Sequence, residues 1–499
     1  MKRNLAPGIA DILFLVVAPL TAITRTLRLT HSDGDLAAHI RMGQVILDTG
    51  KIPAQSLASF TAANDPLVAH AWLSEVILAT LFSVGGLALV SVVTGIIVAS
   101  THAGVALFLR SRGVDARWAL AAAFISLAVS STHWLARPHM FSILGVAITI
   151  WILESGSRNK WRYIAPLFIV WANLHGGWLF GLVIIGAYVV GARIEAAIDT
   201  DRREEWLQTF HTNAVALLVA FAATLVTPFT WANPAGFALH REVLSGATSS
   251  ALASQMGEFM SPNFQAAAPL PFFGALLLTV GLLAVTRKRM SAPHLIVLVV
   301  SLFFALRSFR NMALFGVSAW PLVALHVARA WPPNRRDFPL FREIARVDKT
   351  TTAGLYAVPV AVLLLAVGLN GGSAFGAQII RKDFSPKVFP VAAVERLKAA
   401  NASGRIFESW EWGGYIMYAW PSAGLLVDPL KFNDSTVTAF VKIDSARPGW
   451  QEEVARLNIE TVIIHPDTPL SDGLEREPGW TKWYQDSTAV VFRSNKPNI

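Results

Sequence analysis

Long apolar segments recur through the first three quarters of this 499-residue chain, and they constrain its fold more than any other feature. A helix that crosses the hydrocarbon core of a bilayer needs roughly 20 apolar residues, and somewhat shorter helices can also cross. About eleven segments meet this condition, at residues 9–27, 87–109, 117–133, 139–155, 162–174, 177–195, 211–228, 269–286, 293–306, 311–330 and 352–370. Because a soluble core does not need apolar runs of this length, the pattern predicts a polytopic α-helical membrane protein.

The composition agrees with this fold class. Hydrophobic residues make up 54% of the chain, charged residues only 15%, and the mean hydropathy is +0.48. A soluble domain carries about a quarter charged residues. The net charge of +9 does not indicate a nucleic-acid partner, because Lys and Arg stand in short clusters between the apolar segments. The absence of cysteine excludes disulfides, thiolate metal sites and Cys nucleophiles.

The apolar stretch 71–86 is shorter than the others, carries Glu75 and ends in Gly-Gly. We predict that it forms an interfacial or re-entrant helix that does not cross the membrane. We interpret the N-terminal apolar run, which follows Lys2 and Arg3 and has no small-residue cleavage site, as a retained first span.

The distribution of basic residues between the segments predicts the orientation. With the N-terminus inside, every inside loop holds several Lys or Arg, as the positive-inside rule requires. These loops are Arg110–Arg117, Arg158–Arg162, Arg193–Arg203, Arg287–Arg289 and Arg329–Lys349.

Three larger pieces then fall outside the membrane. Two belong to a transmembrane domain over residues 1–375, namely the first outer loop (28–86) and the outer loop 229–268. The third is the region 380–499, where charges become frequent and short β-rich runs alternate with helix-like stretches. This change predicts a small extracytoplasmic α/β domain.

The first outer loop carries an acidic motif at the start of an amphipathic helix, predicted over residues 35–48. Asp33 and Asp35 lie where the free N–H groups of a helix favour negative charge. His39 follows one turn after Asp35, so both side chains can face the same way. A helix cap on a surface helix is the alternative to a functional role.

The same loop continues through His70 and Glu75. A carboxylate within an apolar helix needs a partner or an aqueous cleft. A side chain that only reaches toward the membrane surface is the alternative for Glu75.

Other His, Arg, Asn and Glu residues project to the same outer side, where the charge asymmetry disfavours basic groups. These candidate substrate-binding residues are Arg137, His139, Asn173, His175, Glu258, Arg307 and Arg310. Carboxylates can act as a general base or hold a metal, and arginines can clamp a phosphate. A phosphate-bearing lipid donor and a hydroxylic acceptor would need this combination beside an apolar groove. Each group alone could instead serve packing or capping.

Several stretches resemble the GT-C superfamily of membrane glycosyltransferases, in a largely uncharacterised bacterial branch related to aminoarabinose transferases and protein O-mannosyltransferases. They are DLAAHIRMGQVILDTGKIP, FTAANDPLVAHAWLSE, ARPHMFS, WANLHGGW, EFMSPNF, RSFRN and EWGGYIMYAWP, and they extend over nearly the whole chain. The resemblance implies a GT-C-like bundle of about 11 transmembrane helices with a small C-terminal extracytoplasmic domain. It also implies a location in the bacterial inner (cytoplasmic) membrane.

By this resemblance, the enzyme moves a sugar from a polyprenyl-phosphate donor to an extracytoplasmic acceptor. Asp33 or Asp35 would be the base, Asp35 would be the ligand of a divalent ion such as Mg or Mn, and Arg307 and Arg310 would bind phosphate. The acidic motif departs from the superfamily, in which the acids are often adjacent, because Gly34 separates them.

Two other functions remain open at this stage. A transporter or flippase would need a polar path open in turn to both faces. A non-catalytic assembly protein would have no cleft around Asp35.

Overall fold

The computed structural model describes residues 6–23, 30, 33–232, 237, 239–241, 243, 257–330, 355–402, 404–431 and 434–495. Most of the predicted basic loop Arg329–Lys349 and part of the outer loop 229–268 lie outside the described residues.

Each of the eleven predicted spans contains a helix in the described part of the chain. These helices are α1 (Ile9–Ile23), α3 (Trp72–Ser111), α4 (Ala116–Ser130), α5 (His139–Leu153), α6 (Trp161–Leu174), α7 (Trp178–Ile198), α8 (Arg203–Thr224), α12 (Leu270–Val285), α13 (Ala292–Arg307), α14 (Met312–Ala330) and α16 (Ala357–Leu369). By length and composition, four segments are long and apolar enough to cross a membrane: Trp72–Ser111, Trp178–Ile198, Arg203–Thr224 and Phe309–Ala330. Five further apolar helices are shorter, so a crossing by all eleven remains a prediction.

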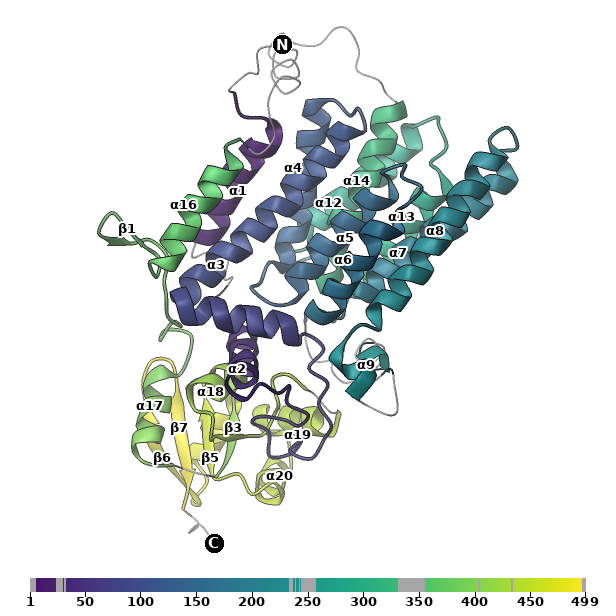
Figure 1. Cartoon of the computed structure of the whole chain (residues 1–499). Helices are drawn as coiled ribbons and strands as arrows, with labels where there is room; N and C mark the ends of the chain where they lie inside the picture. The colour runs from purple at the N-terminus through teal and green to yellow at the C-terminus, as the bar shows by residue number, and fades with distance from the viewer. Residues whose placement is uncertain are drawn as a thin grey trace.

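Helix α3 bends sharply at Gly86, whose backbone is not helical (φ 63°, ψ −161°). A side chain could not replace this glycine, because an added Cβ would lie 2.7 Å from the carbonyl oxygen of Lys382. The arm before the bend lies across the end of the bundle that faces the C-terminal domain, and the arm after it runs with the bundle (Figure 1). The bend thus separates the stretch 71–86, predicted not to cross, from the span predicted at 87–109.

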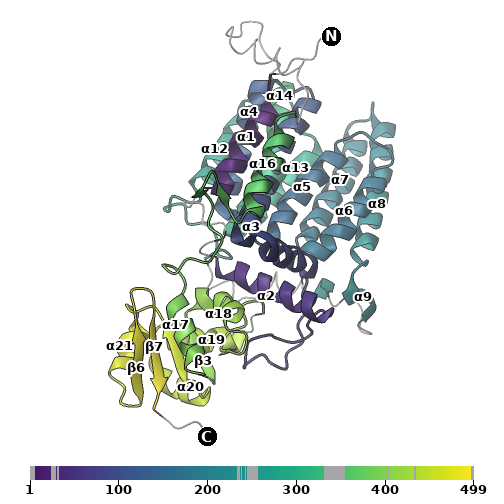
Figure 2. The same cartoon turned by 60° about the vertical axis from the view of Figure 1, so that its left-hand side comes forward.

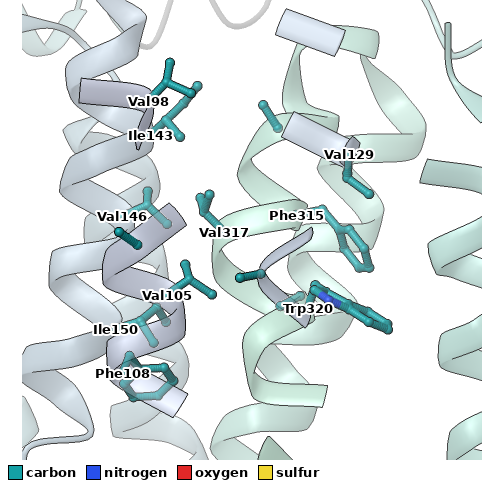
Figure 3. Packing of buried hydrophobic residues seen from close by; sticks show 14 of the residues in the cluster. Val98, Val105, Phe108, Val129, Ile143, Val146, Ile150, Phe315, Val317 and Trp320 are labelled. Carbon is teal, nitrogen blue, oxygen red and sulfur yellow. The ribbon is translucent and has the colours of Figure 1, made fainter. Parts of the chain in front are cut away.

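The helices pack around a continuous apolar core. Figure 3 shows part of it, with Val105 of α3, Ile150 of α5 and Phe315 of α14 among the buried side chains. Side chains on the outside of the bundle are also apolar, for example Leu218 at 70% exposure and Phe303 at 63%. A bundle that is apolar both inside and outside is typical of a protein that sits in lipid.

The C-terminal region folds around a five-stranded mixed sheet in the order β4-β3-β5-β7-β6. Its strands are β3 (Arg405–Glu408), β4 (Gly424–Leu425), β5 (Thr461–Ile464), β6 (Trp480–Gln485) and β7 (Val490–Ser494). Strand β3 pairs in parallel with both β4 and β5. Helices α17 (Val391–Ala399) and α18 (Gly413–Ala419) pack on one face of the sheet, and α19 (Asp434–Asp444), α20 (Trp450–Arg456) and α21 (Pro469–Glu475) pack on the other.

Helix α2 (Gly34–Thr49) lies between the membrane bundle and the C-terminal domain (Figure 2). Its buried residues Leu36 and Ile40 share one core cluster with Leu78 of α3 and Trp412 and Ile416 of the C-terminal domain. The following loop also joins the sheet, because Ser59 forms a parallel bridge with Leu425 of β4. The predicted first loop (28–86) therefore packs against the membrane bundle on one side and against the C-terminal domain on the other.

Candidate active site

The first turn of α2 carries the acidic motif. Asp33 is the N-cap, and its side chain accepts a hydrogen bond from the backbone N–H of Asp35 at 3.2 Å. Asp33 is 4% exposed, whereas the side chain of Asp35 is 32% exposed. Asp33 therefore serves as a helix cap, which was the alternative to a functional role, while Asp35 remains partly accessible on the first turn.

Arg137, in the loop before α5, binds both acids. Its Nε lies 3.0 and 2.9 Å from the two carboxylate oxygens of Asp33, and its Nη2 lies 2.7 Å from Asp33 Oδ1. Its Nη1 lies 2.6 Å from Asp35 Oδ2 and 3.8 Å from Glu258 Oε2. One guanidinium thus links three acids from two distant parts of the sequence, the first turn of α2 and the loop that carries Glu258.

These charges and the burial of the site shift the pKa values of its acids. Burial raises the pKa of Asp35, and the charge of Asp33 raises it further, while Arg137 and His39 oppose the shift. Burial also raises the pKa of Glu258, against the effect of Arg137. Burial lowers the pKa of Arg137, but the charges of Asp33 and Asp35 outweigh it and raise this pKa overall. A carboxylate with a raised pKa is a better proton acceptor than an ordinary aspartate.

His39 and Glu75 form a pair beside the motif. His39 Nδ1 lies 3.1 Å from Glu75 Oε1, and the Glu75 side chain is 4% exposed. The second oxygen, Oε2, is buried and has no hydrogen-bond partner among the described residues. Glu75 therefore has the partner that a carboxylate in an apolar helix needs, although only one of its oxygens is satisfied.

A second polar group lies at the turn between α6 and α7. The Oδ1 of Asn173 accepts a hydrogen bond from Trp72 Nε1 at 2.9 Å. His175 Nδ1 lies 2.7 Å from the hydroxyl of Ser142, which accepts a bond from Trp171 Nε1 at 2.8 Å. The ring of His70 lies 6.1 Å from that of His175, between centroids.

The remaining histidine pair joins the loop before α5 to its first turn. The ring centroids of His139 and His133 lie 4.2 Å apart with the rings tilted by 35°, and Nε2 of His139 lies 3.0 Å from the carbonyl oxygen of His133. Ser142 was not in the predicted set of substrate-binding residues. Ser142 could have been found, because it follows His139 by three residues and so lies on the same helix face.

The two candidate phosphate-binding arginines differ in their surroundings. Arg310 is half-buried, its guanidinium lies 4.0 Å from the Phe259 ring centroid, and its backbone N–H donates to the carbonyl of Glu258. Its positive charge disfavours protonation of the imidazoles of His133, His139 and His175. Arg307, in contrast, is exposed at the C-terminal end of α13 and makes none of the described contacts of the site.

The donor set around Asp35 does not fit a divalent ion. Mg or Mn would need several oxygen ligands directed at one point. Here the guanidinium of Arg137 lies between Asp33, Asp35 and Glu258 and supplies the positive charge. Within the described ranges, no group of three or more His, Asp or Glu could hold a metal ion.

The sheet of the C-terminal domain brings a further polar pair close to α2. His465, directly after β5, and Glu411, just after β3, are joined by a hydrogen bond of 2.6 Å. Ligands of open α/β sheets bind at such carboxyl ends of neighbouring parallel strands. The backbone of Glu411 abuts α2, because a Cβ added to Gly34 would lie 2.1 Å from its carbonyl oxygen. Asp428 and Lys431 lie against Ser59 and Thr61 of the first loop, with no room for a water molecule between them.

No protein-family model matches the chain, and no curated protein matches it in sequence. Solved structures do match over nearly its whole length. The archaeal oligosaccharyltransferase AglB from Archaeoglobus fulgidus, in complex with an inhibitory peptide and a dolichol-phosphate, is 12% identical with a TM-score of 0.52. The match covers 97% of this chain and 74% of that chain.

Two further solved structures are similar. The mycobacterial arabinofuranosyltransferase AftD is 13% identical with a TM-score of 0.52, covering 98% of this chain and 40% of that chain. ArnT from Cupriavidus metallidurans bound to undecaprenyl phosphate is 13% identical with a TM-score of 0.48, covering 96% and 97%. The matches to AglB and AftD show that this chain has the same fold as these two proteins.

Proposed function

We propose that the protein is a membrane glycosyltransferase that moves a sugar from a polyprenyl-phosphate donor to a hydroxyl group of an extracytoplasmic acceptor. The observation that carries the proposal is the partly exposed Asp35, held by Arg137 at 2.6 Å in the first turn of α2. The fold shared with AglB adds support, since AglB binds a dolichol-phosphate.

Asp35 is the general base in this proposal, and Asp33 is a positioning residue. Asp33 is nearly buried, caps α2 and engages Arg137 with both oxygens. Asp35 is the more accessible of the two acids, and burial raises its pKa. The acceptor hydroxyl oxygen attacks the anomeric carbon while its proton passes to Asp35. The bond between that carbon and the phosphate oxygen breaks, and the phosphate leaves with the electron pair.

Arg310 binds the leaving phosphate in this proposal. Arg137 already interacts with three acids, so its charge is largely balanced. Arg310, in contrast, is influenced by the charge of one acid, Glu258. The neighbouring imidazole of His175 can donate a further hydrogen bond to a phosphate oxygen through Nε2, because its Nδ1 accepts from the backbone N–H of Gly177. A guanidinium in a partly buried site stabilises the charge that develops on a leaving phosphate. His39, His70, Glu75 and Asn173 would then line the sugar-binding part of the site.

The acceptor approaches, in this proposal, from the side of the C-terminal domain. The Glu411–His465 pair lies at the carboxyl ends of β3 and β5, where the Glu411 backbone abuts the N-terminus of α2. We also propose that all eleven apolar helices cross a bacterial inner membrane, with residues 380–499 outside.

The test uses purified protein in liposomes with a panel of polyprenyl-phosphate sugars, and it measures release of the polyprenyl phosphate. This product is common to all donors, so the sugar need not be known beforehand. Water takes the place of the acceptor hydroxyl in this assay, so the release measured is hydrolysis of the donor. We expect release with at least one donor by the wild-type protein and its loss in Asp35→Asn. Equal release by both proteins would contradict the assignment of Asp35.

A further inference from the structure

A short hairpin connects the last membrane helix to the C-terminal domain and presents a fully exposed aromatic side chain. Strands β1 (Ser373–Ala374) and β2 (Ala377–Gln378) pair antiparallel, and Phe375 and Gly376 form the two-residue turn. Phe375 is 104% exposed, more than any other large hydrophobic residue among those described. Single exposed apolar side chains are common on proteins, so exposure alone indicates no function.

The backbone of this turn gives a second observation. Phe375 has φ 51° and Gly376 has φ 76°, the pattern of a type I′ turn. Asn, Asp or Gly usually occupies the first position, because other side chains are strained at positive φ. A bulky aromatic residue in that position is unfavourable for folding, and strained residues of this kind gather at functional positions.

The hairpin is held rigidly at the level where the membrane bundle ends. Gln378 Nε2 donates to the carbonyl of Gly371 at 2.7 Å, and Ser373 Oγ donates to Gln378 Oε1 at 2.9 Å. Ile380, at the base of the hairpin, is buried in the core of the bundle. A Cβ on Gly372 would lie 2.9 Å from that of Ala88, two residues beyond the bend of α3. The base therefore sits where the membrane-spanning arm of α3 begins.

The surroundings of the hairpin are those expected of a segment in contact with lipid. It continues directly from α16, whose Val362, Leu363 and Leu369 are 59%, 65% and 55% exposed and form an apolar outer surface. It projects from the lower end of α16 away from the other helices and from the C-terminal domain (Figure 1). The basic Lys382, exposed and close to the bend of α3, suits the headgroup region, where basic side chains flank buried aromatic ones.

We propose that Phe375 inserts into the outer leaflet of the bilayer and anchors the connection between the membrane bundle and the C-terminal domain. The partner is the boundary between lipid headgroups and acyl chains, where aromatic side chains are enriched. This anchor does not depend on the proposed reaction, and it would hold the C-terminal domain close to the membrane surface.

The test exploits the absence of cysteine from the chain, which makes any introduced thiol unique. Ala377→Cys, in the hairpin, is labelled with the fluorophore NBD, and the protein is reconstituted into phosphatidylethanolamine–phosphatidylglycerol vesicles. Lipids with a doxyl group near the headgroup quench fluorophores within the bilayer, and iodide quenches those in water. Val362→Cys on α16 is the lipid control, and Thr481→Cys on β6 is the aqueous control.

We expect label 377 to follow the lipid control, with strong doxyl quenching and little iodide quenching. Adding Phe375→Ser should move it toward the aqueous control, with doxyl quenching at least about twofold weaker, because the anchoring ring is gone. Iodide quenching equal to that of Thr481→Cys would overturn the proposal. So would a label shielded from both quenchers, which would indicate a protein partner, or doxyl quenching that Phe375→Ser leaves unchanged.

Discussion

Arg137 holds Asp33 through two nitrogen atoms, Nε at 2.9 Å and Nη2 at 2.7 Å, although the two residues are 104 positions apart in the sequence. The third nitrogen, Nη1, reaches Asp35. Breaking a buried ion pair on one side leaves an uncompensated charge, which is strongly destabilising. The two aspartates of the motif therefore have different roles, which separate variants can distinguish.

Asp35→Asn should lower kcat by about 10²- to 10⁴-fold, the usual contribution of a general base, without loss of folding. Asp48→Asn, on the exposed far end of the same helix, is the matched control and should retain activity within about twofold, as expected for a surface change. Asp33→Asn should lower thermal stability as well as activity, because it leaves Arg137 partly unpaired. Full activity in Asp35→Asn, with donor turnover measured at saturation, would remove Asp35 from the mechanism.

The pH profile should show the raised pKa of Asp35. A base must be deprotonated, so kcat/KM should fall as the pH falls through a pKa above the ordinary 3.8. Arg137 opposes this shift, so Arg137→Gln should move the acidic limb of the profile to higher pH. The residual activity of Arg137→Gln is compared with the wild type from pH 4 to 9. A limb that stays in place, or moves to lower pH, would show that another group titrates.

Arg310 and Arg307 can be separated by their effects on donor affinity. Arg310→Ala should raise the KM for the polyprenyl-phosphate sugar by about tenfold or more, since a charge-assisted hydrogen bond contributes roughly 1.5–3 kcal/mol. Arg307→Ala, on the exposed end of α13, should change the KM by less than about twofold. The reverse result would show that the phosphate binds nearer the end of α13.

Gly414 of α18 packs against the backbone of α2, so this position has no room for a side chain. A Cβ there would lie 2.1 Å from the carbonyl oxygen of Gly34, between the two aspartates. Gly414→Ala should therefore displace the first turn of α2 and lower activity, with a stability loss of about 1–3 kcal/mol, typical of overpacking. At the neighbouring Gly413, an added Cβ meets only the side chain of Glu408, at 3.6 Å or more. Gly413→Ala thus provides a matched comparison, and equal activities of the two variants would contradict a close contact.

Glu408, at the end of β3, should make the stability of the protein depend on pH. It is 1% exposed, and burial raises its pKa well above 4.5, against hydrogen bonds from the backbone N–H groups of Leu426 and Val427. The folded state thus holds a proton that the unfolded state releases above pH 4.5. Stability is present at low pH and is lost as the pH rises toward the folded-state pKa, by up to about 1.4 kcal/mol per unit. The Tm in detergent should fall from pH 5 to 8 in the wild type and less in Glu408→Gln. Parallel curves would contradict this account.

The sequence by itself determined where the helices lie and which loops carry the polar groups. Apolar runs such as 87–109 and 177–195 form helices for local reasons, because a backbone in lipid must satisfy its own hydrogen bonds. The bend at Gly86 and the acidic start of α2 were also readable, since glycine pairs and helix caps act over a few residues.

Only the tertiary structure decided which of these residues work together. The pairing of Arg137 with Asp33, of His39 with Glu75, and of α2 with α18 joins residues dozens to hundreds of positions apart. Arg307 and Arg310 are nearly equivalent in sequence, but α13 ends at Arg307, and the turn that follows carries Arg310 back over Phe259. Each residue along a helix rotates its side chain by roughly 100°, so contacts of this kind depend on packing angles that a linear pattern does not contain.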